Sequence, residues 1–347
     1  MKTILIITNS THGGGAENTM LLLHTYFLKI GLDSNLVAIN DMDGYQEMIV
    51  EKTFLIHRKW SDGIIQTFKG LRKFKEINKE INPTVIIANC ELPELYVALM
   101  RTHALTIYAV EHTTKPWNGR RVFGFIVRLI LWLKSTKWIT VNQNQKVVWP
   151  CNQESKWIPN PVAEKSENRS VKPDMPDGTT VFVGRLREEK SPRLLLEACE
   201  KLSMPLTLYG DGNLAEELKS RYGDSDLIRF MGYKQNLWSE ISSHSLIVVP
   251  SEYEGDGLVV VEALQNGNPI LLRDNVDLRR FSLDESHYFG DFQELVEKLE
   301  SFRDDPNIHK VDAAVRDRVL KPRSLDSVAK QWISLIDITK KDRTRRR

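Results

Sequence analysis

Residues 246–266 read LIVVPSEYEGDGLVVVEALQN. The first four residues are apolar throughout, which is typical of a parallel strand buried on both faces. A turn containing Pro250, Gly255 and Gly257 follows, and Leu258–Asn266 then has the composition of a helix. A buried strand, a glycine turn and a helix in succession form half of a βαβ unit. The segment therefore predicts an α/β fold built on a parallel sheet.

The same alternation recurs on both sides of this segment. The expected strands are Thr3–Thr8, Val85–Ala88, Thr106–Val110, Trp138–Val141, Thr180–Val183, Leu206–Tyr209, Leu246–Val249 and Pro269–Leu272. The expected helices are Ala16–Ile30, Ile64–Glu80, Pro192–Leu202, Leu214–Arg221 and Leu258–Asn266. Strands alternating with helices predict right-handed crossovers and doubly wound sheets.

A polar segment rich in proline, Ile158–Gly178, interrupts this alternation near the middle of the chain. We therefore expect two domains, an N-terminal one over 1–160 and a C-terminal one over 161–323. A last helical pattern over 324–338 is expected to pack back on the first domain. Residues 339–347 are expected to form a basic tail.

Composition places the chain among ordinary globular proteins. Its 347 residues contain 41% hydrophobic and 27% charged residues, which excludes collagen-like, disordered and disulfide-scaffold classes. The net charge of +2 does not suggest a nucleic-acid partner. Three scattered cysteines without a CxxC spacing favour a reducing cytoplasm and no metal site. The N-terminal MKTILIITNS reads as a first buried strand and not as a signal peptide.

Three strand-to-helix turns carry candidate ligand-binding residues. In the first, THGGGAE over 11–17, Gly14 and Gly15 allow close approach of the backbone to a ligand at a helix N-terminus. The alternative is a turn without a ligand. The spacing is not GxGxxG, which disfavours a dinucleotide-dependent oxidoreductase.

The second turn, VGRLREEKSP over 183–192, presents Arg185 and Lys190 beyond the end of a strand. Ligands of open α/β sheets bind at this edge, and two cations aimed at one point can hold a diphosphate. Pro192 and Ser191 suit the first turn and the cap of the following helix. The alternative is a solvated charged loop.

The third turn is the one quoted first, with Glu254 in the turn and Glu262 in the helix. The helix N-terminus between them suits phosphate, whereas the two carboxylates suit hydroxyl groups on either side of it. This arrangement matches the shape of a sugar nucleotide. The alternative is a helix whose N-terminus is merely complemented by acidic residues.

The chain resembles the family 4 retaining glycosyltransferases, of group 1 type, which have the GT-B fold. The resemblance rests on PSEYEGDGLVVVEALQNGNPI with its Glu254-x7-Glu262 spacing, on VGRLREEKSP, on LYGDG at 208–212, on FMGY at 230–233 and on THGGGAE. It implies two Rossmann-like domains that face an interdomain cleft.

The resemblance also implies roles for individual residues. Glu254 would bind hydroxyls of the transferred sugar, Glu262 would bind the ribose, and Arg185 with Lys190 would bind the diphosphate. His112, which follows an expected strand, would point at the sugar near its anomeric carbon. The remaining residues of the implied nucleotide-sugar site are Gly14, Gly15, Gly184, Gly255, Asp256, Gly257 and Leu258. Asp256 stands where the family commonly has an aromatic residue, so it would either read a sugar hydroxyl or point to solvent.

The implied activity is transfer of a hexose or N-acetylhexosamine from a nucleotide diphosphate sugar, UDP-linked rather than GDP-linked, to a saccharide acceptor on a lipid carrier. No metal cofactor is expected. Surface polysaccharide, such as lipopolysaccharide O-antigen, is the expected product. The alternatives are a sugar-nucleotide epimerase of GT-B fold and a non-catalytic protein that binds polyanions.

A basic and aromatic segment, 115–137, reads KPWNGRRVFGFIVRLILWLKSTK and contains six Lys and Arg residues and no acid. Its apolar part is too short to span a bilayer. It is expected either to lie on an anionic membrane surface, together with the cationic run 340–347, or to form a core helix beside a disordered tail. The first interpretation places the protein on the inner face of the cytoplasmic membrane.

Overall fold

The computed structural model describes residues 2–11, 14–41, 50–59, 62–113, 116–143, 145, 147, 154–163, 178–234 and 236–344. The chain divides into two compact units. The N-terminal unit comprises Met1–Ala163 and Pro322–Arg347, and the C-terminal unit comprises Glu164–Lys321. These boundaries lie within three residues of the expected ones at 160/161 and 323/324.

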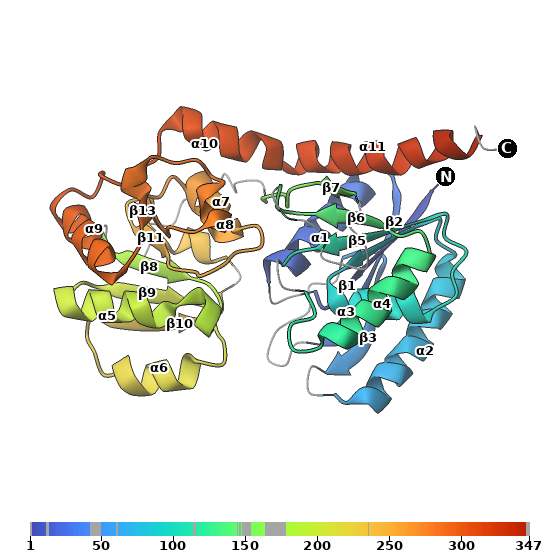
Figure 1. Ribbon diagram of the computed structural model, residues 1–347, viewed down its shortest axis with the longest axis horizontal. Helices are drawn as coiled ribbons and strands as arrows, with labels where there is room; N and C mark the ends of the chain where they lie inside the picture. The colour runs from blue at the N-terminus through green and yellow to red at the C-terminus, as the bar shows by residue number, and fades with distance from the viewer. Residues whose placement is uncertain are drawn as a thin grey trace. The chain divides into compact units, whose positions relative to one another are not determined.

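The N-terminal unit contains a seven-stranded parallel sheet with the order β3-β2-β1-β4-β5-β6-β7 (Figure 1). The strands are β1 (Thr3–Thr8), β2 (Asp33–Asp41), β3 (Thr53–Lys59), β4 (Val85–Asn89), β5 (Thr106–Glu111), β6 (Lys137–Thr140) and β7 (Ser155–Trp157). The helices are α1 (Gly15–Lys29), α2 (Ile64–Ile81), α3 (Glu91–Leu99), α4 (Arg121–Leu133) and α11 (Leu325–Thr344). The order reverses between β1 and β4, which makes this point the topological switch of the sheet.

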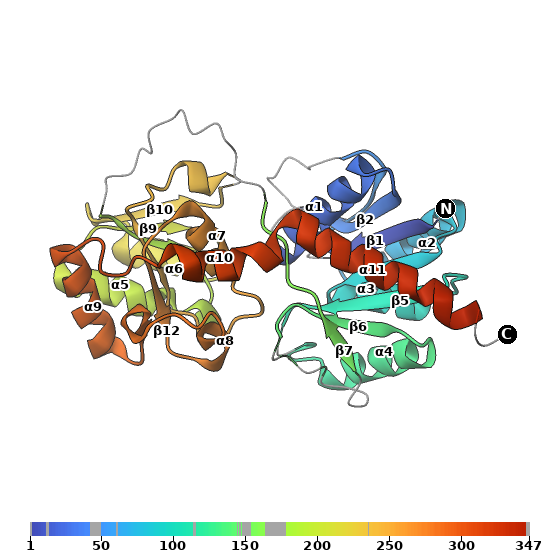
Figure 2. The same cartoon turned by 90° about the horizontal axis from the view of Figure 1, so that it is seen from above.

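Strand β1 shows why its sequence is apolar without alternation. Leu5 and Ile7 join a core with α2, α3 and α4, whereas Ile4 and Ile6 join a second core with α1 and α11. Figure 2 shows α1 and α11 together over one face of the sheet. Since both faces are covered, both sets of side chains are buried, as expected for a parallel sheet.

The C-terminal helix α11 belongs to the N-terminal unit. The Trp332 ring packs edge-on against Tyr108 of β5 with ring centroids 5.8 Å apart. The Tyr26 hydroxyl donates to Oδ1 of Asp326 at 2.7 Å. The expected end of this helix at residue 338 is wrong, because α11 continues to Thr344. Lysine and arginine are good helix formers, and the sequence there contains no glycine or proline that would end the helix.

The C-terminal unit contains a six-stranded parallel sheet with the order β10-β9-β8-β11-β12-β13. Its strands are β8 (Thr180–Val183), β9 (Leu206–Tyr209), β10 (Ile228–Gly232), β11 (Leu246–Val249), β12 (Ile270–Arg273) and β13 (Tyr288–Phe289). Its helices are α5 (Pro192–Leu202), α6 (Ala215–Tyr222), α7 (Leu258–Asn266), α8 (Val276–Arg279), α9 (Phe292–Asp304) and α10 (Ala313–Leu320). Short 3-10 turns are η1 (Glu188–Lys190), η2 (Leu237–Ser239), η3 (Glu285–His287) and η4 (Lys321–Arg323).

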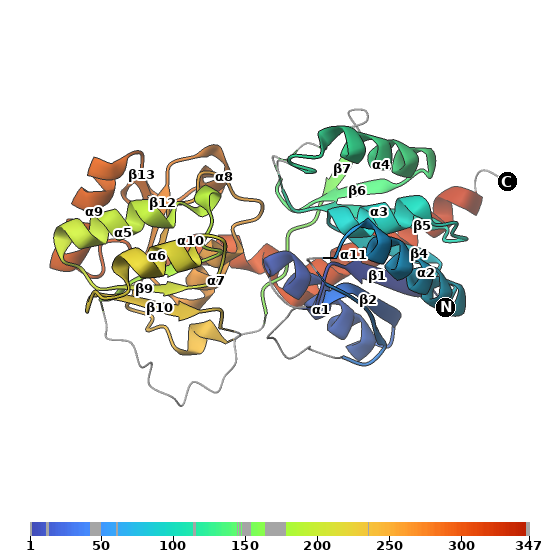
Figure 3. The same ribbon diagram turned by 90° about the horizontal axis from the view of Figure 1, so that it is seen from below.

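Helices α5, α6 and α9 share one core with the strands of this sheet (Figure 3). The sheet order reverses between β8 and β11, so each unit has the doubly wound Rossmann-like arrangement. The expected α/β fold with two parallel-sheet domains is therefore confirmed. Among the described helices, none is both long enough and apolar enough to cross a membrane.

Candidate active site

The candidate site of the C-terminal unit lies at the switch point of its sheet. Strands β8 and β11 are hydrogen-bonded neighbours, and the chain leaves them in opposite directions, toward β9 and toward β12. The loop after β8 carries Arg185 and Lys190, and the loop after β11 carries Glu254. Ligands of doubly wound sheets bind outside the carboxyl ends of the strands at this point.

Two glycines after β9 hold the loop after β8 in place. The Gly184 amide donates to the Tyr209 carbonyl at 3.0 Å, and the Leu186 amide donates to the Asp211 carbonyl at 3.0 Å. A Cβ at Gly210 would lie 1.9 Å from the carbonyl oxygen of Gly184. A Cβ at Gly212 would lie 2.3 Å from the carbonyl oxygen of Leu186. The glycines of the LYGDG motif are thus required by the close approach of two backbone segments.

Lys190 and Glu254 form a direct ion pair. Lys190 Nζ lies 2.6 Å from Oε1 of Glu254, and the Ser251 hydroxyl donates to the same oxygen at 2.8 Å. The Glu254 amide donates to Oδ2 of the buried Asp277 at 3.1 Å, which fixes the backbone of the turn. The pair is half-buried, so each charge is compensated by the other.

The sequence separates these two residues by 64 positions and predicts different ligand groups for them. The structure brings them into contact. A lysine ammonium has three N–H donors, and within the described residues Glu254 takes one of those of Lys190. Lys190 can therefore donate to an anion while it remains paired with Glu254. Arg185 lies on the same loop with its side chain exposed.

Lys190 ends the 3-10 turn η1, and Pro192 occupies the first position of α5, as predicted. Ser191 occupies the N-cap position as predicted, but it does not cap the helix with its side chain. Ser191 has a left-handed backbone with φ 47°, and its side chain makes no capping hydrogen bond. Instead its hydroxyl accepts from Arg273 at 3.3 Å.

Helix α7 begins directly after the glycine turn. Gly257 is its N-cap residue with φ 60°, and a Cβ there would also lie 3.2 Å from the Phe281 ring. Asp256, just before it, is 6% exposed, and its Oδ1 lies 3.7 Å from Nη2 of Arg280. Arg280 also donates to the carbonyl oxygen of Gly255 at 2.7 Å. The alternative that Asp256 points to solvent is therefore wrong, because its carboxylate is buried beside a guanidinium.

Glu262 is the fifth residue of α7. Its hydrogen bond is to Trp238 and not to the Lys190–Glu254 pair. Its Oε2 accepts from the Trp238 indole nitrogen at 3.0 Å. Burial raises the pKa of Glu262 to about 7, and the hydrogen bond from Trp238 opposes that rise. Near neutral pH such a carboxyl group is present both ionised, when it only accepts hydrogen bonds, and protonated, when it can also donate one.

His112 follows β5 in the N-terminal unit and is held by Asn89, the last residue of β4. His112 Nε2 lies 2.6 Å from Oδ1 of Asn89. Asn89 Nδ2 donates to the carbonyl oxygen of Ala16 at 3.1 Å and to the Thr8 hydroxyl at 3.3 Å. A carbonyl oxygen only accepts hydrogen bonds, so the amide nitrogen must face Ala16 and the amide oxygen must face His112.

This network determines the tautomer of His112. Because the amide oxygen of Asn89 accepts, Nε2 of His112 carries the proton and Nδ1 keeps a lone pair. Burial lowers the pKa of His112 to about 4, so the imidazole is neutral at pH 7. A neutral imidazole with a free lone pair on Nδ1 can accept a hydrogen bond from a hydroxyl group.

Comparison with known proteins gives a match for the C-terminal part of the chain. Residues 164–313 match the family model described as glycosyl transferases group 1. The chain is a glycosyltransferase whose C-terminal part is similar to this group. The expected glycosyltransferase activity is thus confirmed at the level of the enzyme class.

The relatives of this glycosyltransferase have similar descriptions. The chain is 25% identical over 291 residues to the O-antigen biosynthesis glycosyltransferase WbnH of Escherichia coli, which covers 79% of this chain and 82% of WbnH. It is 22% identical over 171 residues to the poly(ribitol-phosphate) alpha-N-acetylglucosaminyltransferase of Staphylococcus aureus, covering 45% of this chain and 34% of that enzyme. The crystal structure of Anabaena Alr3699/HepE with UDP and glucose is similar in fold, with a TM-score of 0.74 and 16% identity over 97% of this chain and 100% of HepE. Together with the sheet topology, this likeness shows the GT-B fold.

The N-terminal glycine turn of the glycosyltransferase contains a buried carboxylate. Gly14 is the N-cap residue of α1 and Gly15 its first residue, whereas His12 and Gly13 lie outside the described residues. Glu17, in the first turn, is buried and accepts from Asn9 Nδ2 at 3.3 Å. Because Glu17 already places negative charge at this helix N-terminus, the turn suits a hydroxyl group better than a phosphate.

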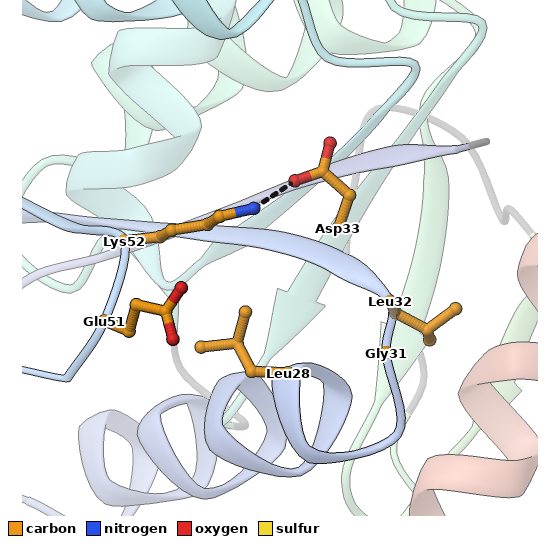
Figure 4. A pocket seen from close by; sticks show the side chains of 6 residues that line it. All are labelled: Leu28, Gly31, Leu32, Asp33, Glu51 and Lys52. Atoms are coloured by element: carbon orange, nitrogen blue, oxygen red, sulfur yellow. Dashed lines mark hydrogen bonds and ion pairs between the residues drawn. The ribbon is translucent and has the colours of Figure 1, made fainter.

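A hollow of about 450 Å³ in the same unit lies elsewhere. It is lined by Leu28, Gly31, Leu32, Asp33, Glu51 and Lys52 (Figure 4). Asp33 is the first residue of β2, and Lys52 directly precedes β3, so the hollow is at the amino edge of the sheet. His112 follows β5 and therefore lies at the opposite, carboxyl edge. Lys52 and Asp33 pair at 2.8 Å, and their charges cancel.

The basic segment 115–137 contains α4. Two of its six cations, Arg128 and Lys134, bind protein groups and are not exposed to solvent as a membrane-binding surface would require. Arg128 is 1% exposed and forms ion pairs with Glu94 at 3.1 Å and Glu111 at 3.2 Å. Lys134 donates to the backbone carbonyls at the end of α3, with Val97 at 2.7 Å. Within the described part of the segment, Arg120, Arg121 and Lys137 remain exposed.

The interpretation of α4 as a core helix is confirmed for one of its faces, and contact with a membrane stays a prediction. Val127 and Leu131 are buried in the core, so α4 is a core helix on one face. Its other face exposes large apolar side chains, with Val122 78% and Leu133 70% exposed. The side chains of 340–347 lie outside the described residues.

Proposed function

We propose that this glycosyltransferase transfers a hexose or N-acetylhexosamine from a UDP-sugar to a saccharide acceptor with retention of anomeric configuration. The observation that carries this proposal is the Lys190–Glu254 ion pair at the switch point, directly before the N-terminus of α7. A cation, a carboxylate and free backbone N–H groups at one strand edge match the diphosphate and the hydroxyls of a nucleotide sugar.

The main catalytic task is to stabilise the leaving diphosphate. Cleavage of the bond between sugar and phosphate leaves negative charge on the nucleotide, and preorganised cations lower the energy of that state. Lys190 is preorganised by Glu254, whose Oε1 also accepts from the Ser251 hydroxyl, and Arg185 extends from the same loop. The backbone N–H groups at Gly257 and Leu258 add the positive end of α7. We propose that this charge stabilisation does not require a metal ion.

The carboxylates act on hydroxyl groups in this proposal. Glu254 has a second carboxylate oxygen besides the one that Lys190 and Ser251 contact, and that oxygen accepts from hydroxyls of the transferred sugar. Glu262 binds the ribose hydroxyls, and the Trp238 indole fixes its orientation. Asp256 acts on the site indirectly. Its carboxylate lies beside Arg280, which donates to the Gly255 carbonyl and so holds the glycine turn.

His112 acts on the sugar near its anomeric carbon. Its neutral Nδ1 accepts a hydrogen bond from a sugar hydroxyl while Asn89 holds Nε2. A neutral imidazole adds no positive charge next to the anomeric carbon, which becomes positively charged as the leaving group departs. The acceptor hydroxyl attacks the same face that the nucleotide leaves.

The relatives and α4 support the proposed acceptor and cellular setting. The similarity to an O-antigen biosynthesis glycosyltransferase supports a role in surface polysaccharide assembly. The exposed apolar face of α4, flanked by Arg120 and Arg121, supports peripheral contact with an anionic membrane on its cytoplasmic side and a lipid-linked acceptor.

The proposal is tested by incubating the purified protein with UDP- and GDP-sugars, with and without a lipid-linked saccharide. We expect sugar transfer from a UDP-sugar only when the acceptor is present, with the anomeric configuration retained in the product. Conversion of the donor sugar without an acceptor would instead indicate an epimerase. Binding of polyanions without turnover of any nucleotide sugar would indicate a non-catalytic protein.

A further inference from the structure

A second hollow of the N-terminal unit, of about 500 Å³, collects basic side chains at the amino edge of the sheet. Lys75 and Lys79 reach it from the last turns of α2, and Arg101 and His103 reach it from the segment that precedes β5. The lining contains no acidic residue. Two separate chain segments therefore bring four basic groups around one space.

These four side chains have no partner within the described part of the chain: none makes a hydrogen bond or an ion pair there. The hollow of Figure 4 has the opposite character, because Lys52 is paired with Asp33 and Glu51 adds a further carboxylate. Like charges brought together without a counter-charge repel one another. An anion in the second hollow would remove that repulsion.

The dipole of α2 explains only part of this cluster. A cation in the last turn of a helix is favourable, and Lys79 occupies that place. Arg101 and His103 lie between α3 and β5 and are not part of α2, so the dipole of α2 does not explain why they are there. The helix also carries Lys69 and Lys73, which are exposed and do not line the hollow, so the cluster is not simply the basic surface of α2.

The remaining lining consists of polar and apolar groups. Asn78 is 9% exposed and lines the hollow, and its Oδ1 has no hydrogen-bond partner among the residues that the structure describes. Because this oxygen is closed to solvent, Asn78 forms part of the wall and not an acceptor that faces the hollow. Leu99, 42% exposed, forms part of the wall and offers an apolar contact.

We propose that this hollow binds a phosphate ester, with its phosphate held by Lys75, Lys79, Arg101 and His103 and its organic group beside Leu99. A phosphate group carries up to two negative charges and offers acceptor oxygens to several cations at once. The site is at the amino edge of the N-terminal sheet, whereas His112 is at the carboxyl edge, so the phosphate site is separate from the proposed sugar-binding residue. The phosphate ester is either a soluble molecule or the headgroup of an anionic phospholipid.

Calorimetric titration of the full chain tests the soluble source, with inorganic phosphate and glycerol 3-phosphate as the probes. Flotation with vesicles of phosphatidylcholine, with and without phosphatidylglycerol, tests the headgroup. The test variant is Lys75→Glu combined with Arg101→Glu. The control, Lys69→Glu combined with Lys73→Glu, makes the same change of charge on the same helix without touching the lining.

We expect glycerol 3-phosphate or the phosphatidylglycerol vesicles to bind the wild-type protein and the control, and the affinity to fall by at least about tenfold in the test variant. Binding of glycerol 3-phosphate identifies a soluble ester, and binding of the vesicles alone identifies a headgroup. Equal losses in the test variant and in the control would overturn the proposal, because they would indicate a diffuse charge effect. Failure of every probe to bind the wild-type protein would overturn it as well.

All four exchanged side chains are exposed, so we expect both variants to fold. Circular dichroism melting curves check this directly. If the glutamate variant unfolds, Lys75→Ala with Arg101→Ala replaces it, with Lys69→Ala and Lys73→Ala as its control. The alanine pair removes the same cations without adding carboxylates, and binding that survives it unchanged contradicts the site.

Discussion

The Oδ1 atom of Asn89 lies 2.6 Å from Nε2 of His112, and the carbonyl of Ala16 determines which end of the Asn89 amide faces the imidazole. The last residue of one parallel strand thus orients a side chain that follows the neighbouring strand. This relationship places the proton of His112 on Nε2 and leaves Nδ1 as an acceptor.

The tautomer of His112 is the first testable consequence. Nitrogen-15 NMR of the imidazole should show the Nε2–H form from pH 5 to pH 8, because burial lowers the pKa of His112 to about 4. Asn89→Asp places a carboxylate against Nε2, so we expect it to raise that pKa measurably. A spectrum of the Nδ1–H form in the wild-type protein would contradict the account of Asn89.

Removal of Arg185 tests charge stabilisation of the leaving group. We expect Arg185→Ala to lower the rate of sugar transfer by about a hundredfold or more, the usual loss for one preorganised charge stabiliser. Arg187→Ala is the control, because Arg187 is an exposed arginine two residues further along the same loop. Steady-state turnover with saturating donor distinguishes the two, and unchanged turnover in Arg185→Ala would rule out its role.

Gly210 tests the packing of the two loops. Alanine at Gly210 would place a Cβ 1.9 Å from the carbonyl oxygen of Gly184 at a φ of +133°. We expect Gly210→Ala to lower the free energy of unfolding by about 3 kcal/mol or more, because backbone must move. Gly232, with φ +67° and open space around it, is the matched control. Its alanine variant should lose only the roughly 1–2 kcal/mol of a left-handed residue. Equal losses in urea denaturation would show that contact with Gly184 is unimportant.

Glu262 makes the stability of the protein depend on pH. Burial raises its pKa to about 7 from an ordinary value of 4.5, so the folded state binds more protons than the unfolded state between these values. Its contribution to stability is therefore complete below pH 4.5 and is lost as the pH rises to 7. Glu262→Gln does not titrate, so the difference in unfolding free energy between this variant and the wild type should change between pH 5 and pH 8. A constant difference would contradict the raised pKa.

The fold follows from the sequence where strands are buried on both faces. Val85–Asn89 and Leu246–Val249 are apolar along nearly their whole length, and both are strands. β2 is not predicted, because Asp33–Asp41 begins and ends with polar residues and its apolar run in the middle is short. Helix α3 is missed for a similar reason, since Pro93 in Glu91–Leu99 interrupts a short pattern. Proline is tolerated there because it lies in the first turn.

Some residues of the candidate site are predicted by the sequence and others are not. Arg185, Lys190, Glu254 and Glu262 belong to continuous motifs, so their spacing identifies them. Asn89 contacts His112 from another strand, and Asp277 and Arg280 contact the turn of Glu254–Asp256 from α8 and its C-terminal end. No local pattern in the sequence predicts such contacts. The burial of Arg128 is hidden for the same reason, because Glu94 and Glu111 are distant from it in the sequence.

UDP binding and sugar transfer, measured together in Lys190→Ala and Glu254→Gln, test the role of this ion pair in the donor site. We expect Lys190→Ala to weaken UDP binding at least about tenfold, because a charge-assisted contact to phosphate is lost. We expect Glu254→Gln to keep UDP binding within a few-fold but to lower transfer by about a hundredfold. UDP binding that is the same in Lys190→Ala as in the wild-type protein would contradict the assignment of this ion pair to the donor site.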